Sequence, residues 1–442
     1  MEITDLSLDG LGIGRVDGEV VFVPGTLPGE RAVVRLRGRG RRRLADLLGL
    51  VTRSPQRRRP PCILAADCGG CSLQTLADDA QRDWKGRTVA EALRRIGGLE
   101  VPVAPPPPPC ATLGYRNRAV IPLERREDGR LRAGYYRRGS HRIVNMNRCP
   151  VLDPRLDRLI APLKADLDAS GWRMDHHQGT VRHLSLRVGH HSGEILITLI
   201  ATEPRLEGVE ELAERWRRRW PEVVGVALNL QPHPDNRLFG PETVTLAGRA
   251  WLEEAFAGVR LQVGPDTFFQ INTAEAERAA TQIIEGLAGE PGLLVDAFCG
   301  IGTFSLPLAA RGWRVLGIER MDAAVELARS NAVRNGLSEQ ARFEVGGVAE
   351  ALATCLETPG SPVAALLIDP PRKGLDSPTL SAIEAAPPPQ LLYLSCDPST
   401  LARDLGRLCG SGPYRLDSLQ TFDFFPHTTH VETLAVLRTG AG

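Results

Sequence analysis

The 442-residue sequence predicts three domains: a small N-terminal β-barrel, a central α/β region, and a C-terminal α/β domain built on a doubly wound parallel sheet. In the last third, short apolar runs alternate with helical patterns, which is typical of a parallel sheet covered by helices. Near the N-terminus, glycines separate short runs of period two, which is typical of a small barrel. We expect the domains to span residues 1–57, 58–262 and 263–442.

The overall composition excludes several classes of protein. No window offers about eighteen consecutive apolar residues, so we expect no membrane-spanning helix and no membrane partner. The first residues, MEITDLSLDG, lack the basic and apolar segments of a signal peptide. We therefore expect a cytoplasmic protein, and we expect it to be a monomer. Nine cysteines in such a chain favour metal binding or catalysis over disulfides.

Residues 1–57 contain the runs GLGIGRV, EVVFVPG and ERAVVRLR. Apolar side chains recur at every second position, as in Ala32, Val34 and Leu36, so one face of each strand can point into a barrel of OB type. A basic cluster suits the phosphate backbone of a nucleic acid, with a solvated surface as the alternative interpretation. Its members are Arg35, Arg37, Arg39, Arg41, Arg42, Arg43, Arg53, Arg57 and Arg59.

The central region begins with cysteines and a helical pattern at 76–97, followed by the proline run VPVAPPPPPC at 101–110. Such a run is extended and acts as a stiff connector. Beyond it the chain mixes strand patterns at 183–188 and 194–200 with a helical pattern at 206–220. No catalytic motif is visible there.

The C-terminal region predicts five parallel strands and a closing antiparallel pair. Helical patterns separate the five, and one of them, MDAAVELARSNAVRNG, ends on Gly336 as a helix C-cap does. Only PHTTHV separates YRLDSLQTFDFFP from ETLAVLRT, so these two runs are expected to pair antiparallel at the sheet edge. The five expected strands are 293–298, 314–319, 341–346, 364–370 and 390–395.

A nucleotide-type pocket is expected where the first of these strands ends, in DAFCGIGTF. Gly300 and Gly302 allow a sharp bend and a close approach to a ligand. Glu319 ends the next strand, where an acid commonly binds ribose hydroxyls. Asp369, in DPPRKGL, lies at the carboxyl end of the fourth strand and should face the same crevice. The alternative interpretation of the glycines is an ordinary tight turn.

The run LSCDPSTLARDL places Cys396 between the fifth strand and a helix. The helix N-terminus predicts a lowered pKa for this thiol, which favours a nucleophile over a buried structural cysteine. A general base is available in DFFPHTTHVETL, where Glu432 follows His427 and His430.

Four further cysteines could hold a metal: Cys62, Cys68, Cys71 and Cys149. Thiolates of one compact segment plus one distant position suit zinc or an iron–sulfur cluster, and general metal chemistry does not choose between them. Four unligated cysteines are the remaining alternative.

Together, D-x-F-C-G-x-G, SCDPSTLARDL and FPHTTHVE resemble the signatures of the RNA uracil-5-methyltransferases, which use a Rossmann-like class I methyltransferase domain. The resemblance extends to the N-terminal run, which is similar to a TRAM domain, and to the cysteine spacing, which is similar to the 4Fe-4S site of one branch of this family. One departure is VGGV after the third strand, where Gly346 and Gly347 stand in place of a polar or acidic residue.

The resemblance implies roles for individual residues. Cys396 would add to C6 of uracil, and Glu432 would later remove the C5 proton. The four cysteines named above would hold a 4Fe-4S cluster. S-adenosylmethionine would be bound by Gln270, Phe298, Gly300, Gly302, Thr303, Glu319 and Asp369.

The resemblance also implies the partner, a uridine flipped out of folded RNA. The cluster-bearing branch acts mostly on large-subunit ribosomal RNA, so 23S rRNA is expected. The T-loop uridine of tRNA is the alternative within the family. From other classes, a non-catalytic iron–sulfur RNA-binding protein would not need Cys396, Glu432 and Asp369 together. A methyltransferase of small molecules or proteins would not need the basic barrel.

Overall fold

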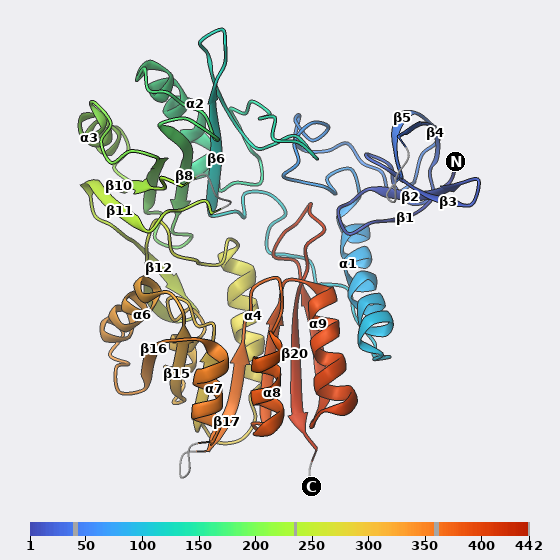
Figure 1. Ribbon diagram of the computed structural model, residues 1–442, viewed down its shortest axis with the longest axis vertical. Coiled ribbons are helices and arrows are strands. Elements are labelled where there is room, and N and C mark those ends of the chain that lie inside the picture. The colour runs from blue at the N-terminus through green and yellow to red at the C-terminus, as the bar shows by residue number, and fades with distance from the viewer. Residues whose placement is uncertain (39–42, 234–236, 358–361, 441–442) are drawn as a thin grey trace.

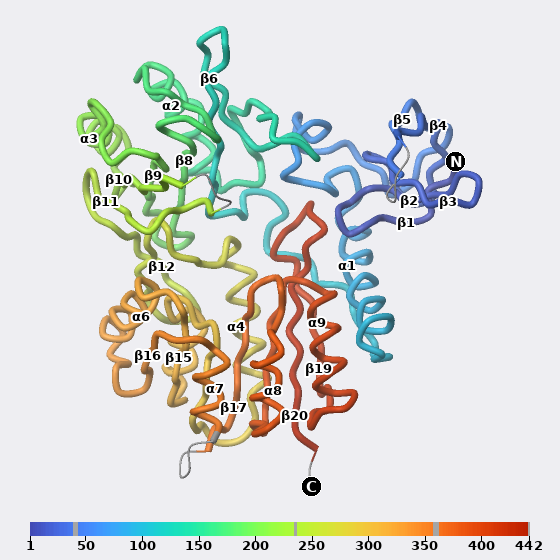
Figure 2. The backbone as a smooth tube through the Cα atoms, in the orientation of Figure 1, coloured from blue at the N-terminus to red at the C-terminus, as the bar shows by residue number. Residues whose placement is uncertain are grey.

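The computed structural model describes residues 1–38, 43–233, 237–357 and 362–440. An N-terminal barrel, a central region and a C-terminal sheet domain surround the segment that follows the barrel (Figure 1). The smooth backbone trace shows that helix α1 (Asp78–Ala92) runs beside the C-terminal domain, which is far from it in sequence (Figure 2). In the ranges described, no helix has the length and apolar character needed to cross a membrane.

The N-terminal barrel is a five-stranded sheet in the order β1-β2-β3-β5-β4. A bridge between Glu2 and Arg31 joins the first strand to the last and closes the sheet. In β4 the predicted alternation is confirmed, since Ala32 is buried while Arg31 and Arg35 are exposed. The strands are β1 (Ile3–Leu6), β2 (Gly12–Val16), β3 (Glu19–Val23), β4 (Arg31–Arg37) and β5 (Arg43–Thr52).

The basic cluster of this barrel is partly neutralised by carboxylates. Arg37 pairs with Asp46, and Arg43 pairs with Glu19. Arg57 donates to the buried carboxylate of Glu30 at 2.8 Å and is therefore part of the barrel structure. Arg39, Arg41 and Arg42 lie outside the described residues.

Helix α1 confirms the helical pattern expected at 76–97 and continues through a π-helical turn, η1 (Leu93–Gly97). Val89 and Leu93 enter the core of the C-terminal domain. The close approach to helix α9 (Pro398–Leu405) requires glycine, because a Cβ on Gly97 would lie 2.6 Å from the Ala402 carbonyl oxygen.

The central region is a six-stranded sheet in the order β11-β10-β9-β8-β6-β7. The predicted strands at 183–188 and 194–200 and the helix at 206–220 are confirmed as β8, β9 and α3. A hairpin, β12–β13, then packs on the core of the C-terminal sheet. The elements are β6 (Arg118–Arg125), β7 (Leu131–Ala133), α2 (Pro154–Ala169), β8 (Val181–Val188), β9 (Ile195–Ala201), α3 (Val209–Arg219), β10 (Val223–Leu230), β11 (Glu242–Gly248), β12 (Leu252–Phe256) and β13 (Val259–Val263).

The C-terminal sheet has the order β16-β15-β14-β17-β18-β20-β19. The five predicted parallel strands and the antiparallel pair are all confirmed. The strands are β14 (Leu293–Ala297), β15 (Arg314–Glu319), β16 (Ala341–Val345), β17 (Val363–Ile368), β18 (Gln390–Ser395), β19 (Tyr414–Phe422) and β20 (Glu432–Thr439).

Helices cover this sheet on both faces, as a doubly wound fold requires (Figure 1). Helix α6 ends before Gly336, whose φ of +67° is the left-handed cap that the sequence predicts. The remaining helices are α4 (Thr273–Gly286), α5 (Ser305–Ala309), α6 (Asp322–Arg334), α7 (Val348–Glu357), α8 (Ser377–Ala385) and the π-helical turn η2 (Gly406–Ser411).

A buried ion pair joins α1 to the C-terminal domain. The Lys85 Nζ donates to Asp423 at 2.5 Å, and the two side chains are 0% and 4% exposed. Because Lys85→Met would leave the Asp423 charge buried without its partner, we expect the free energy of unfolding to fall by about 3–5 kcal/mol.

Urea unfolding followed by circular dichroism measures this loss. The double variant Lys85→Met, Asp423→Leu should recover most of it, because no charge is then left unpaired. Arg95→Ala, which breaks an exposed pair with Glu91 on the same helix, should change stability by less than about 1 kcal/mol. If the Lys85 and Arg95 variants lowered the free energy of unfolding equally, the stabilising role of the buried Lys85–Asp423 pair would be contradicted.

Candidate active site

The register of two strands brings Cys396 and Glu432 together. Strands β18 and β20 pair antiparallel, with Ser395 opposite Thr433. The next pair of positions in the same register is Cys396 and Glu432, at the edge where the parallel strands end. Glu432 is 5% exposed, and its charge is among the causes that raise the pKa of Cys396.

The environment of the Cys396 thiol differs from the expectation. Asp397 caps helix α9 by accepting from the backbone N–H groups of Ser399 at 2.9 Å and Thr400 at 3.1 Å, so the predicted helix start is confirmed. The predicted lowering of the thiol pKa is wrong. Burial raises the pKa of Cys396 to about 12, with the charges of Glu432 and Asp369 adding to the effect.

Buried acids surround this position. Asp369 follows β17 and accepts a hydrogen bond from the Gln270 amide at 3.3 Å. Burial and the neighbouring charge of Asp296 raise the pKa of Asp369 to about 7. The pKa of Glu432 lies well above its usual value, because the carboxyl is buried and faces Asp369. These groups therefore hold protons in the free protein more readily than exposed carboxyls do.

The predicted nucleotide loop follows β14. Gly300 and Gly302 have φ of +55° and +84°, so both adopt the left-handed backbone that glycine accepts without strain. Phe298 also has a positive φ, +68°. The backbone N–H of Gly300 donates to Glu319 at 3.3 Å, which ties the loop to the end of β15. Thr303, in the same loop, is largely buried.

This loop lies where the strand order of the sheet reverses. Strand β14 has β15 on one side and β17 on the other. The helix after β15, α6, and the helix after β17, α8, pack in two different cores on opposite faces of the sheet. Open α/β sheets bind nucleotide-like ligands in the crevice at that point. The loop, Glu319 and Asp369 follow three adjacent strands and meet at this edge of the sheet, whereas Gln270 lies before α4 and reaches Asp369 through its hydrogen bond.

Two residues of this region carry roles that the sequence alone did not reveal. The Arg372 charge lowers the pKa of both Cys396 and Glu432 against the effect of burial. Asp404 is buried and accepts from the Tyr393 hydroxyl at 2.7 Å and from the Leu375 backbone N–H at 2.9 Å. It thereby holds the loop after β17 against α9. For Arg372, the available sequence signal was its position directly after Asp-Pro-Pro. Asp404 gave no such signal.

The four cysteines of the predicted metal site line one cavity of about 550 Å³. Backbone N–H groups donate to two of the thiols, from Leu64 to Cys62 and from Gly70 to Cys68, each at 3.4 Å. Across the part of the chain that the structure describes, no group of three or more His, Cys, Asp or Glu is arranged to hold a metal ion. The other lining residues include Arg116, Arg138, Arg372, Phe425 and His430.

The two histidines near Glu432 separate. His430 lines the cavity that the cysteines share, and its ring packs on Phe425 with the centroids 5.6 Å apart. His427 instead turns toward helix α1, where its ring is 1% exposed. The two histidines that precede Glu432 therefore point to different places, His430 toward the cysteine cavity and His427 toward α1.

Comparison with known protein families gives two matches. Residues 258–439 match the tRNA (uracil-5-)-methyltransferase model, and residues 2–37 match the TRAM domain model. An uncharacterized RNA methyltransferase of Parasynechococcus marenigrum is 52% identical, with 99% of this chain and 95% of the relative covered. One from Listeria monocytogenes is 35% identical, with 99% and 96% covered.

A solved structure resembles the whole chain. It is the tRNA (uracil-54, C5)-methyltransferase of Pyrococcus abyssi in complex with S-adenosyl-L-homocysteine, 27% identical, with a TM-score of 0.78 and 99% of each chain covered. Taken with the parallel sheet, its closing antiparallel pair and the N-terminal barrel, these similarities show that the chain belongs to the RNA methyltransferases that join a TRAM domain to a tRNA (uracil-5-)-methyltransferase domain.

Proposed function

We propose that the protein transfers a methyl group from S-adenosylmethionine to C5 of a specific uridine in 23S rRNA, with Cys396 as the nucleophile and Glu432 as the general base. The observation that carries this proposal is the antiparallel register of β18 and β20, which puts a thiol and a buried carboxyl side by side at the ligand-binding edge of the sheet. A nucleophile and a base at that edge are what C5 methylation of uracil requires.

The chemistry follows from the weak nucleophilicity of C5. The Cys396 thiolate adds to C6, which moves negative charge into the ring and makes C5 nucleophilic. S-adenosylmethionine supplies the electrophilic methyl group when bound. Glu432 then takes the proton from C5, and the bond from C6 to the Cys396 sulfur breaks. The uridine gains one methyl group and loses one proton, and the thiolate is regenerated.

The pKa values of the site bear on the first step. Because burial raises the pKa of Cys396 to about 12, the thiol must lose its proton before it can add to C6. Besides Glu432, the carboxyls whose charges act on this thiol are Asp369 and Asp397, and Asp369, whose pKa is about 7, is the proposed acceptor of the thiol proton. Arg372 opposes them, and its charge favours the thiolate.

The proposed cofactor site fits S-adenosylmethionine. The glycine loop leaves room for a ligand to approach the backbone, and Glu319 at the end of β15 can accept hydrogen bonds from ribose hydroxyls. Gln270, Phe298, Gly300, Gly302, Thr303 and Asp369 complete the proposed set. The ligand named for the Pyrococcus abyssi structure, S-adenosyl-L-homocysteine, supports this assignment.

We propose that the TRAM barrel contacts the RNA, with exposed Arg35 and Arg53 among the contacts. The preference for 23S rRNA rests on the four-cysteine spacing, which is similar to the branch that acts on large-subunit RNA. A second candidate is the T-loop uridine of tRNA. It is favoured by the similarity in sequence and fold to the Pyrococcus abyssi enzyme, which is named for a tRNA uracil.

We further propose that Cys62, Cys68, Cys71 and Cys149 hold a 4Fe-4S cluster. All four thiols line the same cavity, and backbone N–H groups already donate to two of them, as they do to cluster-ligating sulfurs. Burial raises the pKa of Cys71 to about 11 and of Cys149 to about 12, so metal binding has to displace protons from these thiols. Such a cluster would be structural or would position RNA.

Methyl-labelled S-adenosylmethionine distinguishes the substrates. Protein purified without oxygen is offered unmodified 23S rRNA and tRNA transcripts separately, and each product is digested for nucleoside mass spectrometry. We expect label in 5-methyluridine from the ribosomal RNA. Label in the tRNA alone would move the target to the T-loop. No label in either RNA, with cofactor bound, would contradict the proposed function and favour a small-molecule or protein substrate.

Glu432→Gln tests the proposed base. Addition at C6 does not need the carboxylate, whereas removal of the C5 proton does. We therefore expect a covalent protein–RNA adduct to accumulate and turnover to fall by about 10²–10⁴-fold, measured by denaturing gel electrophoresis and by product formation.

Cys396→Ala is the matched control, since it should form neither adduct nor product while still binding S-adenosylmethionine. Cys409→Ala changes a thiol in the turn η2, remote from the crevice. This variant should still form the adduct and the methylated product. Normal turnover of the Glu432 variant without an adduct would exclude Glu432 as the base.

Metal analysis tests the proposed cluster. We expect anaerobically purified protein to contain about four iron and four sulfide per chain and to show a broad visible absorption. Cys68→Ser should lose most of this iron, whereas Cys110→Ser, outside the set, should keep it. Zinc at about one per chain in place of iron would show the alternative metal, and intact iron in the Cys68 variant would contradict the ligand set.

A further inference from the structure

The segment that carries the proposed base, residues 423–431, is held by parts of the chain far from it in sequence. We call it the base loop. The Lys85 Nζ donates to the Phe425 carbonyl at 3.1 Å, and the Tyr115 hydroxyl donates to the Pro426 carbonyl at 3.1 Å. The Leu73 backbone N–H donates to the His427 carbonyl at 2.8 Å. The conformation of the loop therefore depends on α1 and on the segment that contains the first three metal-site cysteines.

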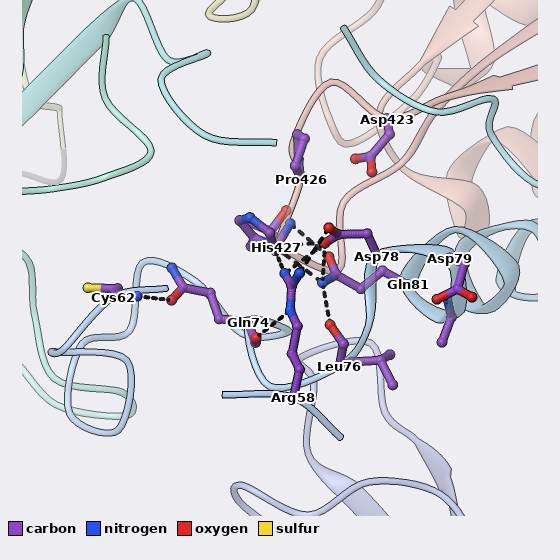
Figure 3. A network of polar contacts seen from close by, with 12 residues as sticks. Arg58, Cys62, Gln74, Leu76, Asp78, Asp79, Gln81, Asp423, Pro426 and His427 are labelled. Carbon is purple, nitrogen blue, oxygen red and sulfur yellow. Dashed lines mark hydrogen bonds and ion pairs between the residues drawn. The ribbon is translucent and has the colours of Figure 1, made fainter. Parts of the chain in front are cut away.

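His427 is the centre of these contacts (Figure 3). Its backbone N–H donates to the Gln81 side chain at 2.9 Å. Its Nδ1 lies 3.1 Å from Arg58 Nη2 and 3.3 Å from the Gln81 amide nitrogen. A guanidinium can only donate, so Nδ1 is the acceptor and the ring is neutral. The contact of 3.8 Å between Nδ1 and Asp78 is therefore not an ion pair.

The same residues lead back to the cysteine segment. Arg58 donates to the Gln74 carbonyl at 3.2 Å and pairs with Asp78 at 2.7 Å. The Gln74 side chain in turn accepts from the Cys62 backbone N–H at 3.2 Å (Figure 3). One continuous set of hydrogen bonds thus runs from a cysteine of the proposed metal site, through Gln74 and Arg58, to His427.

The backbone at His427 also needs support. Its φ of +67° is the left-handed conformation, which a residue with a Cβ adopts only where its surroundings impose it. Here those surroundings are the contacts from Leu73, Gln81 and Arg58. Five residues further on, the chain enters β20 at Glu432. Cys396, in contrast, follows β18 and is attached to α9, which makes none of these contacts.

We propose that His427 is a positioning residue for the base: by holding the base loop against α1 and the cysteine segment, it directs Glu432 toward the C5 proton and leaves the attack by Cys396 unaffected. This inference rests on the proposed function. It assigns the cysteine segment a part in the second half of the reaction, because the partner of His427, Arg58, is itself held by Gln74. Loss of the His427 contacts should therefore slow the breakdown of the adduct and spare its formation.

Single-turnover kinetics on the RNA methylated by the wild-type protein tests this. His427→Phe keeps a ring of similar size and removes the acceptor. We expect the His427→Phe variant to form the adduct at a rate within about threefold of wild type. The adduct should break down at least about tenfold more slowly than in wild type, so that it accumulates. His427→Asn, which tolerates the left-handed backbone and keeps a side-chain acceptor, should recover much of the release rate.

Two further variants keep the test decisive. Tyr414→Phe removes a buried hydrogen bond to Pro388 at the far end of β19, so it should lower stability without changing the ratio of adduct formation to release. Arg58→Met removes the nearer of the two donors to His427 Nδ1 without altering the base loop itself. If His427→Phe does not fold, the Arg58 variant must show the same slow release.

The outcomes separate the two proposals. Wild-type release in His427→Phe, or in Arg58→Met, while wild-type protein makes 5-methyluridine and Glu432→Gln traps adduct, would overturn the positioning role alone. Adduct absent from both wild type and Glu432→Gln would overturn the proposed function and this inference with it.

Discussion

The direction of one strand determines the chemistry of the C-terminal domain. Five parallel strands bring their carboxyl ends to one edge of the sheet, and β20 runs the opposite way between β18 and β19. The amino end of an antiparallel strand lies at the edge where its parallel neighbours end. Cys396, after β18, and Glu432, at the start of β20, are therefore adjacent although 36 positions separate them in the printed sequence. The glycine loop after β14 and Asp369 after β17 reach the same edge for the same reason.

Much of this arrangement could be predicted from the sequence, because it depends on local patterns. Alternating strands and helices predict the sheet, and a cysteine or acid at the end of a predicted strand falls at the ligand-binding edge. The pKa of Cys396 could not be predicted in this way. The helix N-terminus was visible in Asp397 and Ser399, whereas the burial that outweighs it depends on the whole fold. The pairing of Arg57 with Glu30 and the turning of His427 toward α1 are likewise long-range contacts without a local signal.

The electrostatics of the free active site favour neutral groups. Burial raises the pKa of Cys396, Asp369 and Glu432 together, and each negative charge makes the next one harder to form. A site with few charges costs less to bury, and it avoids leaving a reactive thiolate exposed to oxidants in the absence of RNA. Arg372 is the charge within reach that favours ionisation of both Cys396 and Glu432.

The packing of α1 on α9 has a consequence for synthesis of the chain. Lys85 and Val89 are buried against the C-terminal domain, yet Ala92 at the end of α1 precedes Pro398 at the start of α9 by some three hundred residues. At the usual speed of translation, about 5–20 residues per second, α1 waits on the order of tens of seconds for its partner. During that time the face of α1 that carries Lys85 and Val89 stays uncovered. This face of α1 is therefore completed only when the last quarter of the chain has been synthesised.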